Sequence, residues 1–424
     1  MGYVIESPVD CGLGGRRGVW KGKDLRVVTG REGIRGKCLV VVSMIYVPSN
    51  HFVAREAPNR ESIEVLVEYR SSSKRKDALW PTPFTTLPLR RTKTTPNSKM
   101  LTVALAGATT GLGLTILRRL TSSSTNTHKI VLLSRSPQPT WTARGVLVHE
   151  VDYESHETLT VALQGVHTVL SLIGGSATAL RDGQLALVAA AKQAGVKRFA
   201  PSEFSLRGGG YDLDLYAGKS AVWDTVVASG MEYTRFSCGI FMGFLGTGTP
   251  KGVSAVGKRE GARSGEEEAL GGLRAWDFVV NAKNGTADFP GDGRQTVAFT
   301  DTRDVARFVE AALGMEVWPE ELAMRGDLMD WRELVGIFER VQGRTFLVKE
   351  NEVGEMERVA KEVEGKRFYN QVRIALVEGD GVVGDELNKA FPDIKPVGVE
   401  EFVRKWWEGV ELGEAKWEED RSFM

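Results

Sequence analysis

Residues 101–119 have the sequence LTVALAGATTGLGLTILRR, and this stretch decides the fold of the chain. It opens with an apolar run long enough for a buried strand, continues through Gly107, Gly111 and Gly113, and then shows apolar residues at helical spacing. A strand, a glycine turn and a helix in this order are typical of the turn that holds a dinucleotide pyrophosphate, rather than of an ordinary loop. The glycines permit close approach of the phosphates, and the first N–H groups of the helix face the anion.

Strand-like and helix-like segments alternate up to residue 238. Apolar segments typical of strands follow at residues 129–133, 145–151, 167–173, 198–200 and 233–236. Helical patterns lie at residues 112–120, 154–163, 180–194 and 220–229, and Gly195 is the expected C-terminal cap of the third of these. Such alternation predicts a doubly wound parallel sheet with helices on both faces. We therefore expect a Rossmann-type α/β domain over residues 100–238.

The alternation stops after Cys238. Residues 251–272 are rich in glycine and charge and predict a mobile surface loop. Helical patterns return at residues 304–313, 330–341, 352–364, 366–377 and 400–407. We expect residues 239–424 to form mainly a smaller, mixed α/β substrate-binding domain on the carboxyl ends of the parallel strands.

The first 99 residues differ in composition from the rest. Residues 1–100 contain 18 Lys and Arg against 9 Asp and Glu, whereas the whole chain has 55 of each. One strand-like segment (39–47) and one short helix or strand (61–69) lie among Gly/Arg-rich and Ser/Thr/Pro/Lys-rich segments, which predicts a poorly structured extension. Three hypotheses remain open: a disordered extension, a segment before a true start at Met100, and an organelle-targeting segment, against which the acidic residues count.

The overall composition is that of a soluble globular protein. The chain has 424 residues and a formal net charge of zero, which argues against a dedicated nucleic-acid binder. Three cysteines without paired or metal-ligand spacing indicate a reducing compartment, so we expect a cytoplasmic protein without a structural metal. No apolar run reaches the ~18–20 residues that span a bilayer, so no membrane association is expected.

Arg135 follows the second predicted strand. In such folds the residue at this position meets the adenine ribose, where a carboxylate accepts from a free 2′-hydroxyl and an arginine pairs with a 2′-phosphate. The strand end has the sequence Ser134-Arg135-Ser136 and no acid, which favours NADP(H) over NAD, although a solvated surface arginine is the alternative. Asp152, after the third strand, could contact adenine, but we expect it to be a helix N-cap.

Lys219 is the candidate for proton transfer. A lysine buried beside a cofactor could exchange a proton while the nicotinamide moves a hydride, and burial would bring its pKa toward neutrality; a surface charge is the alternative. The Tyr-x-x-x-Lys pair of common short-chain dehydrogenases is absent, because Tyr216 lies only three residues before Lys219. We therefore do not expect a tyrosine to act as the general acid.

The five histidines do not cluster as metal ligands, and no Cys/His/Asp set is typical of a hydrolase. After the sixth strand, Phe241, Met242 and Phe244 form an apolar group. These residues could form the wall of an aromatic substrate site or simply core.

Several motifs occur in the order found in one family. They are Gly107-Ala108-Thr109-Thr110-Gly111-Leu112-Gly113, Ala194-Gly195-Val196-Lys197-Arg198-Phe199, Pro201-Ser202-Glu203-Phe204, Lys219 and Gly239-Ile240-Phe241-Met242. From about residue 100 to residue 407 the chain resembles the NmrA-like and isoflavone-reductase-like branch of atypical short-chain dehydrogenases. Two features depart from this branch: the glycine spacing is the wider short-chain-dehydrogenase form, and the charged stretch 251–272 lies where the substrate pocket would be completed.

This resemblance implies an NADP-binding fold with a small substrate domain. Thr109, Thr110 and Leu112 would line the cofactor turn with the three glycines. Lys219 matches the proposed catalytic lysine of the reductases, near the nicotinamide, together with the strand end that carries Phe204. We therefore expect an NADPH-dependent reductase of a small aromatic or enone-type molecule. The alternative is a redox sensor of the NmrA type, which binds NAD(P) without turnover and reports to a protein partner.

Overall fold

The structure, a computed structural model, describes residues 100–210, 213–251 and 265–417, and in residues 1–99 only the backbone of six short strands. The chain divides into two units, Met1–Thr86 and Leu87–Met424. In the first unit the six strands form three antiparallel pairs: β1 (Gly18–Gly22) with β2 (Leu25–Thr29), β3 (Gly33–Ile34) with β4 (Lys37–Cys38), and β5 (Ser43–Val47) with β6 (His51–Arg55). Strand β5 lies within the predicted segment 39–47, and the predicted segment 61–69 lies outside the described residues.

A six-stranded parallel sheet organises the second unit. Its strands are β7 (Thr102–Ala106), β8 (Lys129–Ser134), β9 (Leu147–Glu150), β10 (Thr168–Ser171), β11 (Arg198–Ala200) and β12 (Glu232–Tyr233). The spatial order β12-β11-β10-β7-β8-β9 reverses direction beside β7, which is the doubly wound order of dinucleotide-binding folds. The predicted Rossmann-type fold is therefore confirmed.

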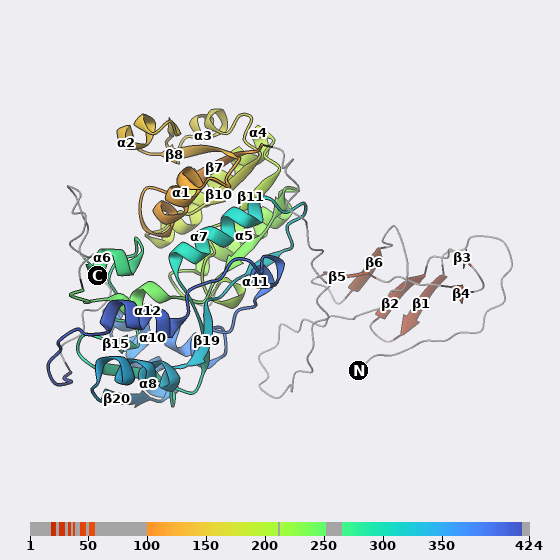
Figure 1. The fold of residues 1–424 in the computed structure, drawn as a ribbon. Coiled ribbons are helices and arrows are strands. Elements are labelled where there is room, and N and C mark those ends of the chain that lie inside the picture. Colours follow the sequence, from red (N-terminus) through yellow and green to blue (C-terminus); the bar gives the residue numbers. More distant parts are fainter. Residues whose placement is uncertain are drawn as a thin grey trace. The chain divides into compact units, whose positions relative to one another are not determined.

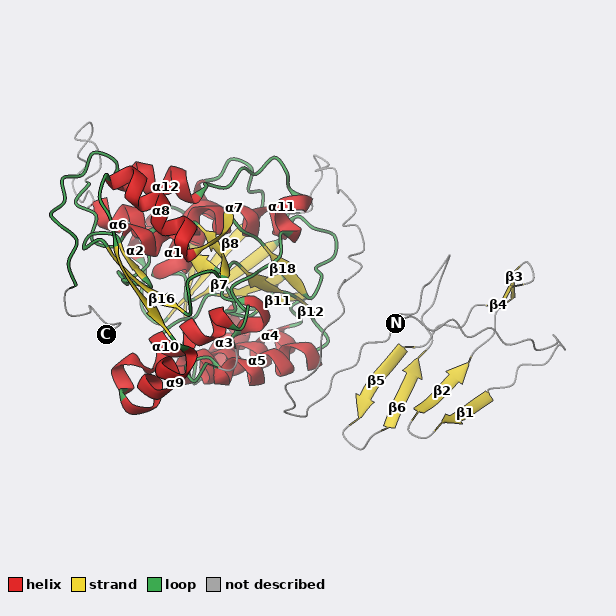
Figure 2. Ribbon diagram, turned by 90° about the horizontal axis from the view of Figure 1, so that it is seen from below, coloured by secondary structure: helices red, strands yellow, loops and turns green. Residues whose placement is uncertain are grey.

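Helices cover both faces of this sheet (Figures 1 and 2). Alternate residues of β7 point to opposite faces, so Val103 and Leu105 belong to one core while Ala104 and Ala106 belong to the other. The covering helices are α1 (Gly111–Ser122), α2 (Pro139–Ala143) and α7 (Thr302–Leu313) on the first face, and α3 (His156–Ala162), the π-helical turn η1 (Ala179–Gly183), α4 (Gln184–Ala194) and α5 (Ala217–Ala228) on the second. Gly195 ends α4 with a φ of 75°, as expected of a C-terminal cap.

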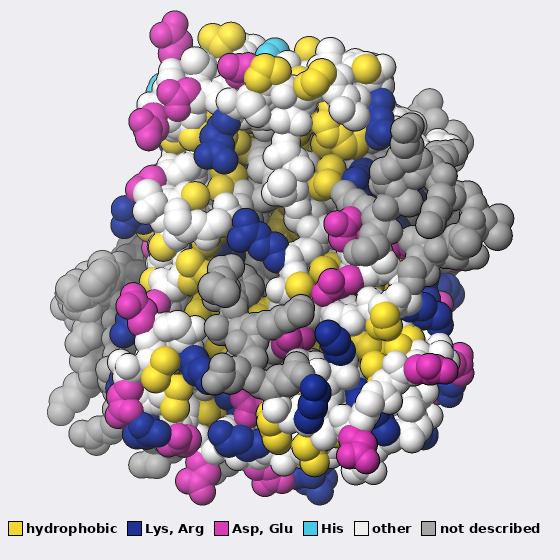
Figure 3. Space-filling model, turned by 90° about the vertical axis from the view of Figure 1, so that its left-hand side faces the viewer, with side chains coloured by type: hydrophobic (Ala, Val, Ile, Leu, Met, Phe, Trp, Pro, Cys, Tyr) yellow, Lys and Arg dark blue, Asp and Glu magenta, His cyan; other side chains and the backbone are white. Residues whose placement is uncertain are grey.

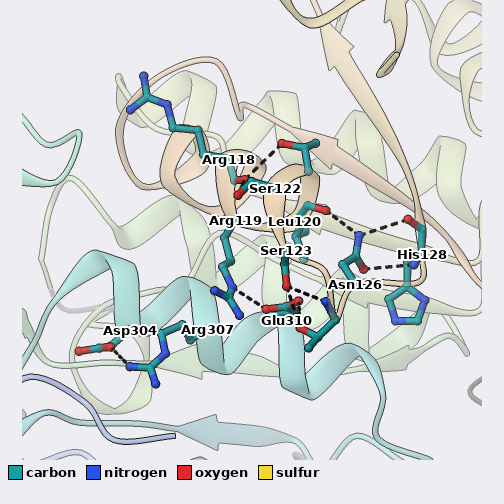
Figure 4. Close-up of polar contacts among 12 residues, drawn as sticks. Arg118, Arg119, Leu120, Ser122, Ser123, Asn126, His128, Asp304, Arg307 and Glu310 are labelled. Carbon is teal, nitrogen blue, oxygen red and sulfur yellow. Dashed lines mark hydrogen bonds and ion pairs between the residues drawn. The ribbon is translucent and has the colours of Figure 1, made fainter. Parts of the chain in front are cut away.

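Helix α7 comes from the half of the chain expected to form the substrate domain, yet it packs along α1 of the cofactor domain. Its Glu310 accepts a 2.6 Å hydrogen bond from Nε of Arg119 on α1, and it also accepts one from Thr125 (Figure 4). The short strand β18 (Glu321–Ala323) likewise returns, pairing in parallel with β13 (Arg235–Ser237). Elements from both sides of residue 238 thus pack together within the second unit.

The remaining elements form a mixed layer around a third core, which contains Trp331, Phe338 and Trp407. Its strands are β14 (Ile240–Phe241), β17 (Thr296–Thr300) and β19 (Asp327–Asp330) in one sheet, and β15 (Val280–Asn281), β16 (Thr286–Pro290) and β20 (Leu347–Asn351) in another. Its helices include α8 (Trp331–Gln342), α9 (Val353–Glu362), α10 (Glu364–Val377), α11 (Glu386–Ala390) and α12 (Val399–Trp407). Asp330 caps α8 in a reciprocal capping box with Glu333, as its position predicts. No helix in the described ranges is long and apolar enough to cross a membrane.

Three local expectations need correction. The predicted sixth strand divides, because β12 ends at Tyr233 beside β11 and β13 leaves that sheet to pair with β18. The predicted loop 251–272 contains a short helix, α6 (Gly265–Leu270), while residues 252–264 lie outside the described part. Asp152 is not the N-cap of α3, since Ser155 accepts the capping bond from the Thr158 N–H.

The glycine turn after β7 lies directly against the end of β10. Gly107 has a φ of +78°, and a Cβ there would lie 2.7 Å from the backbone of Leu172 and Ile173. A Cβ on Gly113 would lie 2.6 Å from the Gly107 carbonyl oxygen. These distances are shorter than any carbon contact tolerates, so the turn and the helix can close onto the sheet only with glycine at both positions.

Replacing Gly107 with alanine tests this close approach against a matched control. Gly145 has a nearly equal φ of +80° but nothing within 4 Å of its Cβ position. We expect G145A to lose about 1 kcal/mol of unfolding free energy from the left-handed backbone alone. We expect G107A to lose roughly 2–4 kcal/mol, because the steric overlap adds to the same strain. Urea unfolding without cofactor measures both, and equal losses would contradict the account.

Candidate functional site

The N-terminus of α1 is open to an anion. Thr110, its N-cap, makes no side-chain capping bond, and no acidic residue lies in the first turn. The backbone N–H groups of this turn and the positive end of the helix dipole therefore remain available to a phosphate. Around the turn, Thr109 and Leu112 are half-buried and Thr110 is exposed. The predicted cofactor residues of the glycine turn thus lie together at the carboxyl end of β7.

Arg135 lies at the carboxyl end of the adjacent strand β8 and is exposed. Burial raises the pKa of Tyr153, which follows β9, to about 12, while the Arg135 charge acts in the opposite direction. Asp152 accepts a 2.9 Å bond from the Glu154 N–H. The strand next to the glycine turn thus ends in an exposed arginine, at the position where such folds meet an adenine ribose.

Lys219 lies in the first turn of α5 and is only 4% exposed. Its amine, Nζ, lies 4.2 Å from the ring centroid of Tyr216, the residue that caps α5. Burial lowers the pKa of Lys219, and the charge of the buried Glu203 acts against this shift. The lysine that sequence reasoning could equally place on the surface is therefore a buried amine with a carboxylate and an aromatic face in its surroundings.

Two further ionisable groups belong to this cluster. Burial raises the pKa of Tyr216 to about 12, with Glu203 adding to the shift and a side-chain hydrogen bond with Ser205 opposing it. Burial also raises the pKa of the Cys238 thiol to about 12, with the Lys219 charge acting to lower it. Both groups are consequently neutral near pH 7.

The strand end 201–205 holds this cluster in place. The Ser202 N–H donates a 2.8 Å bond to Oε1 of the fully buried Gln184 on α4. The Ser205 carbonyl accepts 3.1 Å bonds from the N–H groups of Cys238 and Gly239, which joins the end of β11 to the end of β13. These bonds join the segments that carry Glu203 and Cys238, distant in sequence, and both residues are buried and contribute to the pKa of Lys219.

Phe204 is buried in the core of the cofactor domain. Its ring stacks on Phe236 with centroids 5.3 Å apart and planes 12° apart. Its side chain is 8% exposed, so the predicted cofactor contact of Phe204 stays a prediction.

A continuous chain of aromatic rings leads toward the lysine. Phe241 packs against Phe244 at 6.2 Å between ring centroids, and Phe244 packs against Trp276 at 5.2 Å. Trp276 lies 6.1 Å from Phe368, whose edge meets Tyr216 at 5.5 Å. Phe241 and Phe244 are half-buried, whereas Met242 is fully buried and supports the chain from within the core.

The structure thus brings several predicted residues to one edge of the sheet and adds others. The glycine turn, Arg135 and the strand end 201–204 all follow carboxyl ends of parallel strands. Sequence reasoning gave no role to Glu203, Tyr216, Trp276 or Phe368. The three-residue spacing of Tyr216 and Lys219 is the one local feature of the sequence that could have indicated their contact. The contacts of Trp276 and Phe368 depend on long-range packing.

A cavity of about 350 Å³ lies elsewhere, between α1, α6 and α7. It is lined in part by Arg118, Arg119, Arg303 and Arg307, and it contains none of the predicted site residues. Arg307 pairs with Asp304 and Arg119 with Glu310 (Figure 4). On the face drawn in Figure 3, basic and acidic side chains are likewise interspersed. Among the described residues, no group of three His, Cys, Asp or Glu could hold a metal ion.

Fold and site together define a dinucleotide-binding protein with a buried lysine. Comparison with known proteins shows what the chain is similar to: residues 99–264 match the model of the NmrA-like family. The chain is 29% identical over 255 residues to oxidoreductase BOA1 of Botryotinia fuckeliana (strain B05.10), covering 58% of this chain and 77% of the relative. It is 25% identical over 282 residues to isoflavone reductase of Glycine max, covering 62% and 79% of the two chains.

Solved structures give the same result for the fold. The structure titled "AtPrR2 with NADP+ and (+)pinoresinol" matches with a TM-score of 0.56 and 21% identity, over 73% of this chain and 99% of the other. The predicted resemblance to NmrA-like and isoflavone-reductase-like proteins is therefore confirmed.

Arg135 provides a test of the cofactor side of the site. If its guanidinium pairs with a 2′-phosphate, R135A should weaken NADPH binding about 10- to 100-fold through loss of a charge-assisted hydrogen bond, and leave NADH binding within about twofold. Fluorescence titration of both cofactors measures this, with R144A, the loss of another exposed arginine, as the control. Equal weakening of NADPH and NADH, or none, would show that Arg135 does not distinguish the two.

Proposed function

We propose that this chain is an NADPH-dependent reductase of a small aromatic or enone-type molecule, with Lys219 as the proton donor. The observation that carries the proposal is the buried Lys219 amine at the end of the aromatic chain that begins at Phe241. The names of the relatives, an oxidoreductase and an isoflavone reductase, support the class of reaction.

The residues of the cofactor side fit a dinucleotide phosphate. Gly107 and Gly113 let the turn and the start of α1 pack closely on the sheet, and the first turn of α1 carries no acid that would repel a phosphate. Arg135 would pair with the 2′-phosphate, and Thr109, Thr110, Gly111 and Leu112 would surround the pyrophosphate. When bound, NADPH supplies a hydride to an electrophilic carbon of the substrate and leaves as NADP⁺.

Lys219 completes the addition of hydrogen. A substrate carbonyl or conjugated double bond that accepts a hydride needs one proton at its oxygen or at the second carbon. The Lys219 ammonium donates this proton, directly or through a water, and the neutral amine regains one from solvent. Burial lowers the pKa of this amine, which brings it closer to the range in which a donor works best.

The aromatic chain provides the apolar contacts for the substrate. Phe241 and Phe244 are half-buried and would present ring faces or edges to a flat molecule. Trp276 is 7% exposed and holds Phe244 from behind, while Phe368 joins the chain to Tyr216. A flat aromatic or enone substrate matches such a wall better than a charged metabolite does.

Removing the amine of Lys219 tests the mechanism. We expect K219A to lower kcat about 10²–10⁴-fold, the usual contribution of a positioned proton donor, and to change the dissociation constant of NADPH less than about tenfold. In the wild-type protein, activity should fall as pH rises through the pKa of Lys219, since only the charged amine donates. Steady-state kinetics across pH measure both effects. Full turnover in K219A would exclude Lys219 as the donor.

A redox sensor is the second candidate, and the match of residues 99–264 to the NmrA-like family favours it. The two functions differ in turnover. We expect a panel of enones, isoflavonoids and quinones to contain a compound that oxidises bound NADPH, followed by its absorbance at 340 nm. Tight binding of NADPH without oxidation by any compound would favour the sensor and a protein partner.

A further inference from the structure

We propose that Thr115 on α1 is a positioning residue that ties the glycine turn of the cofactor site to the aromatic chain of the substrate site. It acts through the turn Gly271–Gly272, which follows α6. This inference deepens the proposed function and rests on it for the identity of the two sites. The motifs that point to the cofactor give Thr115 no role.

The turn Gly271–Gly272 is held against α1 and α7. The Gly271 carbonyl oxygen accepts a 2.7 Å bond from the Thr115 hydroxyl and a 3.0 Å bond from the Thr302 hydroxyl at the start of α7, so both of its lone pairs are used. Gly272 lies so close to the first turn of α1 that a Cβ there would be 2.8 Å from the Gly111 carbonyl oxygen. This segment therefore touches the turn whose N–H groups would hold the pyrophosphate.

The end of α6 also packs on the part of the chain that carries the aromatic side chains. The 3₁₀ turn η3 (Met242–Gly246) contains Phe244 of the aromatic chain. A Cβ on Gly243 would lie 2.7 Å from the Leu270 carbonyl oxygen, and Ala269 beside it is fully buried. The turn that contacts α1 follows immediately in the chain, so a segment of a few residues touches both sites.

The hydrogen bond of Thr115 makes this segment follow the state of α1. A phosphate bound to the first turn of α1 restricts the motion of that turn, and a segment bonded to the turn loses motion with it. Phe244, which is carried by the turn that packs on this segment, is then held where a substrate would meet it. By linkage, a ligand on the aromatic chain strengthens the binding of the cofactor by the same factor.

Hydrogen exchange of single amides in the full-length protein follows this coupling without turnover, because a bonded amide exchanges only when its bond opens. Three amides, each with a 3.1 Å bond to a carbonyl three or four residues earlier, report on the first turn of α1, the turn after α6 and η3: they belong to Leu114, Leu273 and Thr247. In the wild-type protein, saturating NADP⁺ should slow exchange at all three. At Thr247 we expect a change of about fivefold or more, the lower end of the usual coupling between two sites.

Replacing Thr115 with valine removes the bond and keeps the shape of the side chain. A methyl group cannot approach the Gly271 oxygen to 2.7 Å, so the turn loses this tie to α1. Without cofactor, exchange at Leu273 should rise about fivefold, which corresponds to about 1 kcal/mol, the usual net contribution of one hydrogen bond. With NADP⁺, exchange at Leu114 should still slow, while the effect on Thr247 disappears. A residue that only stabilised the fold would leave the ratio of rates with and without NADP⁺ unchanged.

Three further variants complete the test. T115S keeps the hydroxyl and should retain the effect of NADP⁺ at Thr247. T121V makes the same change on the same helix, where the hydroxyl bonds to the carbonyls of Leu117 and Arg118 on α1 itself, and it should behave as the wild type. T115A removes the hydroxyl without adding a methyl group and provides the test if T115V does not fold. An effect at Thr247 that persists in whichever of T115V and T115A folds, or that is missing from the wild type, overturns the inference.

The outcomes also separate this inference from the proposed function. If NADP⁺ slows exchange at Thr247 in the wild type but not in T115V, while no compound of the panel oxidises NADPH, the coupling stands and the reductase proposal fails. If a compound is reduced while NADP⁺ leaves exchange at Thr247 unchanged, the reductase proposal stands and the role of Thr115 is wrong.

Discussion

A lysine amine held away from water is the constraint on which the candidate site depends. An ammonium loses most of its hydration on burial, and the protein must replace that hydration with groups aimed at the charge. Here the Tyr216 ring at the start of α5 lies 4.2 Å from the amine, and the charge of Glu203, in the strand end after β11, opposes the effect of burial on the pKa of Lys219. The parallel sheet brings these together because the carboxyl ends of its strands meet at one edge, where the glycine turn also lies. The glycine turn and the residue proposed as the proton donor are therefore positioned by the same sheet.

Much of the fold could be predicted because its signals are local. The apolar run before Gly107, the helical spacing after it and the cap at Gly195 each depend on a few neighbouring residues, and each matches the structure. The elements that departed from prediction are set by long-range contacts. Helix α7 packs on α1 across 191 residues, as the Arg119–Glu310 bond shows, and β13 leaves the main sheet because β18 offers it a partner. Sequence periodicity predicts a helix or a strand, but it does not predict which other element that helix packs against or that strand pairs with.

The candidate site follows the same division. The glycine turn, Arg135 and Lys219 could be named from spacing and resemblance, whereas the aromatic chain could not, since Trp276 and Phe368 meet only in the folded chain. Tyr216 illustrates a different limit. The four-residue spacing rule applies to two residues on the surface of one helix, but Tyr216 is the N-cap and reaches Lys219 from the end of α5. The missing four-residue spacing excludes a tyrosine–lysine pair on one helix face, but it does not exclude a contact made from the end of the helix.

The position of the Lys219 amine relative to the bound cofactor is the most direct test of this account. A crystal structure of the full chain with NADP⁺ would measure the distance from Nζ to the nicotinamide ribose and to the carbon that carries the hydride. If Lys219 is the proton donor, its amine lies within hydrogen-bond reach, about 3 Å, of the ribose hydroxyls or of a substrate molecule on the nicotinamide face. A nicotinamide bound away from α5, with the Lys219 amine still against the Tyr216 ring, would contradict this role and leave the lysine a structural charge.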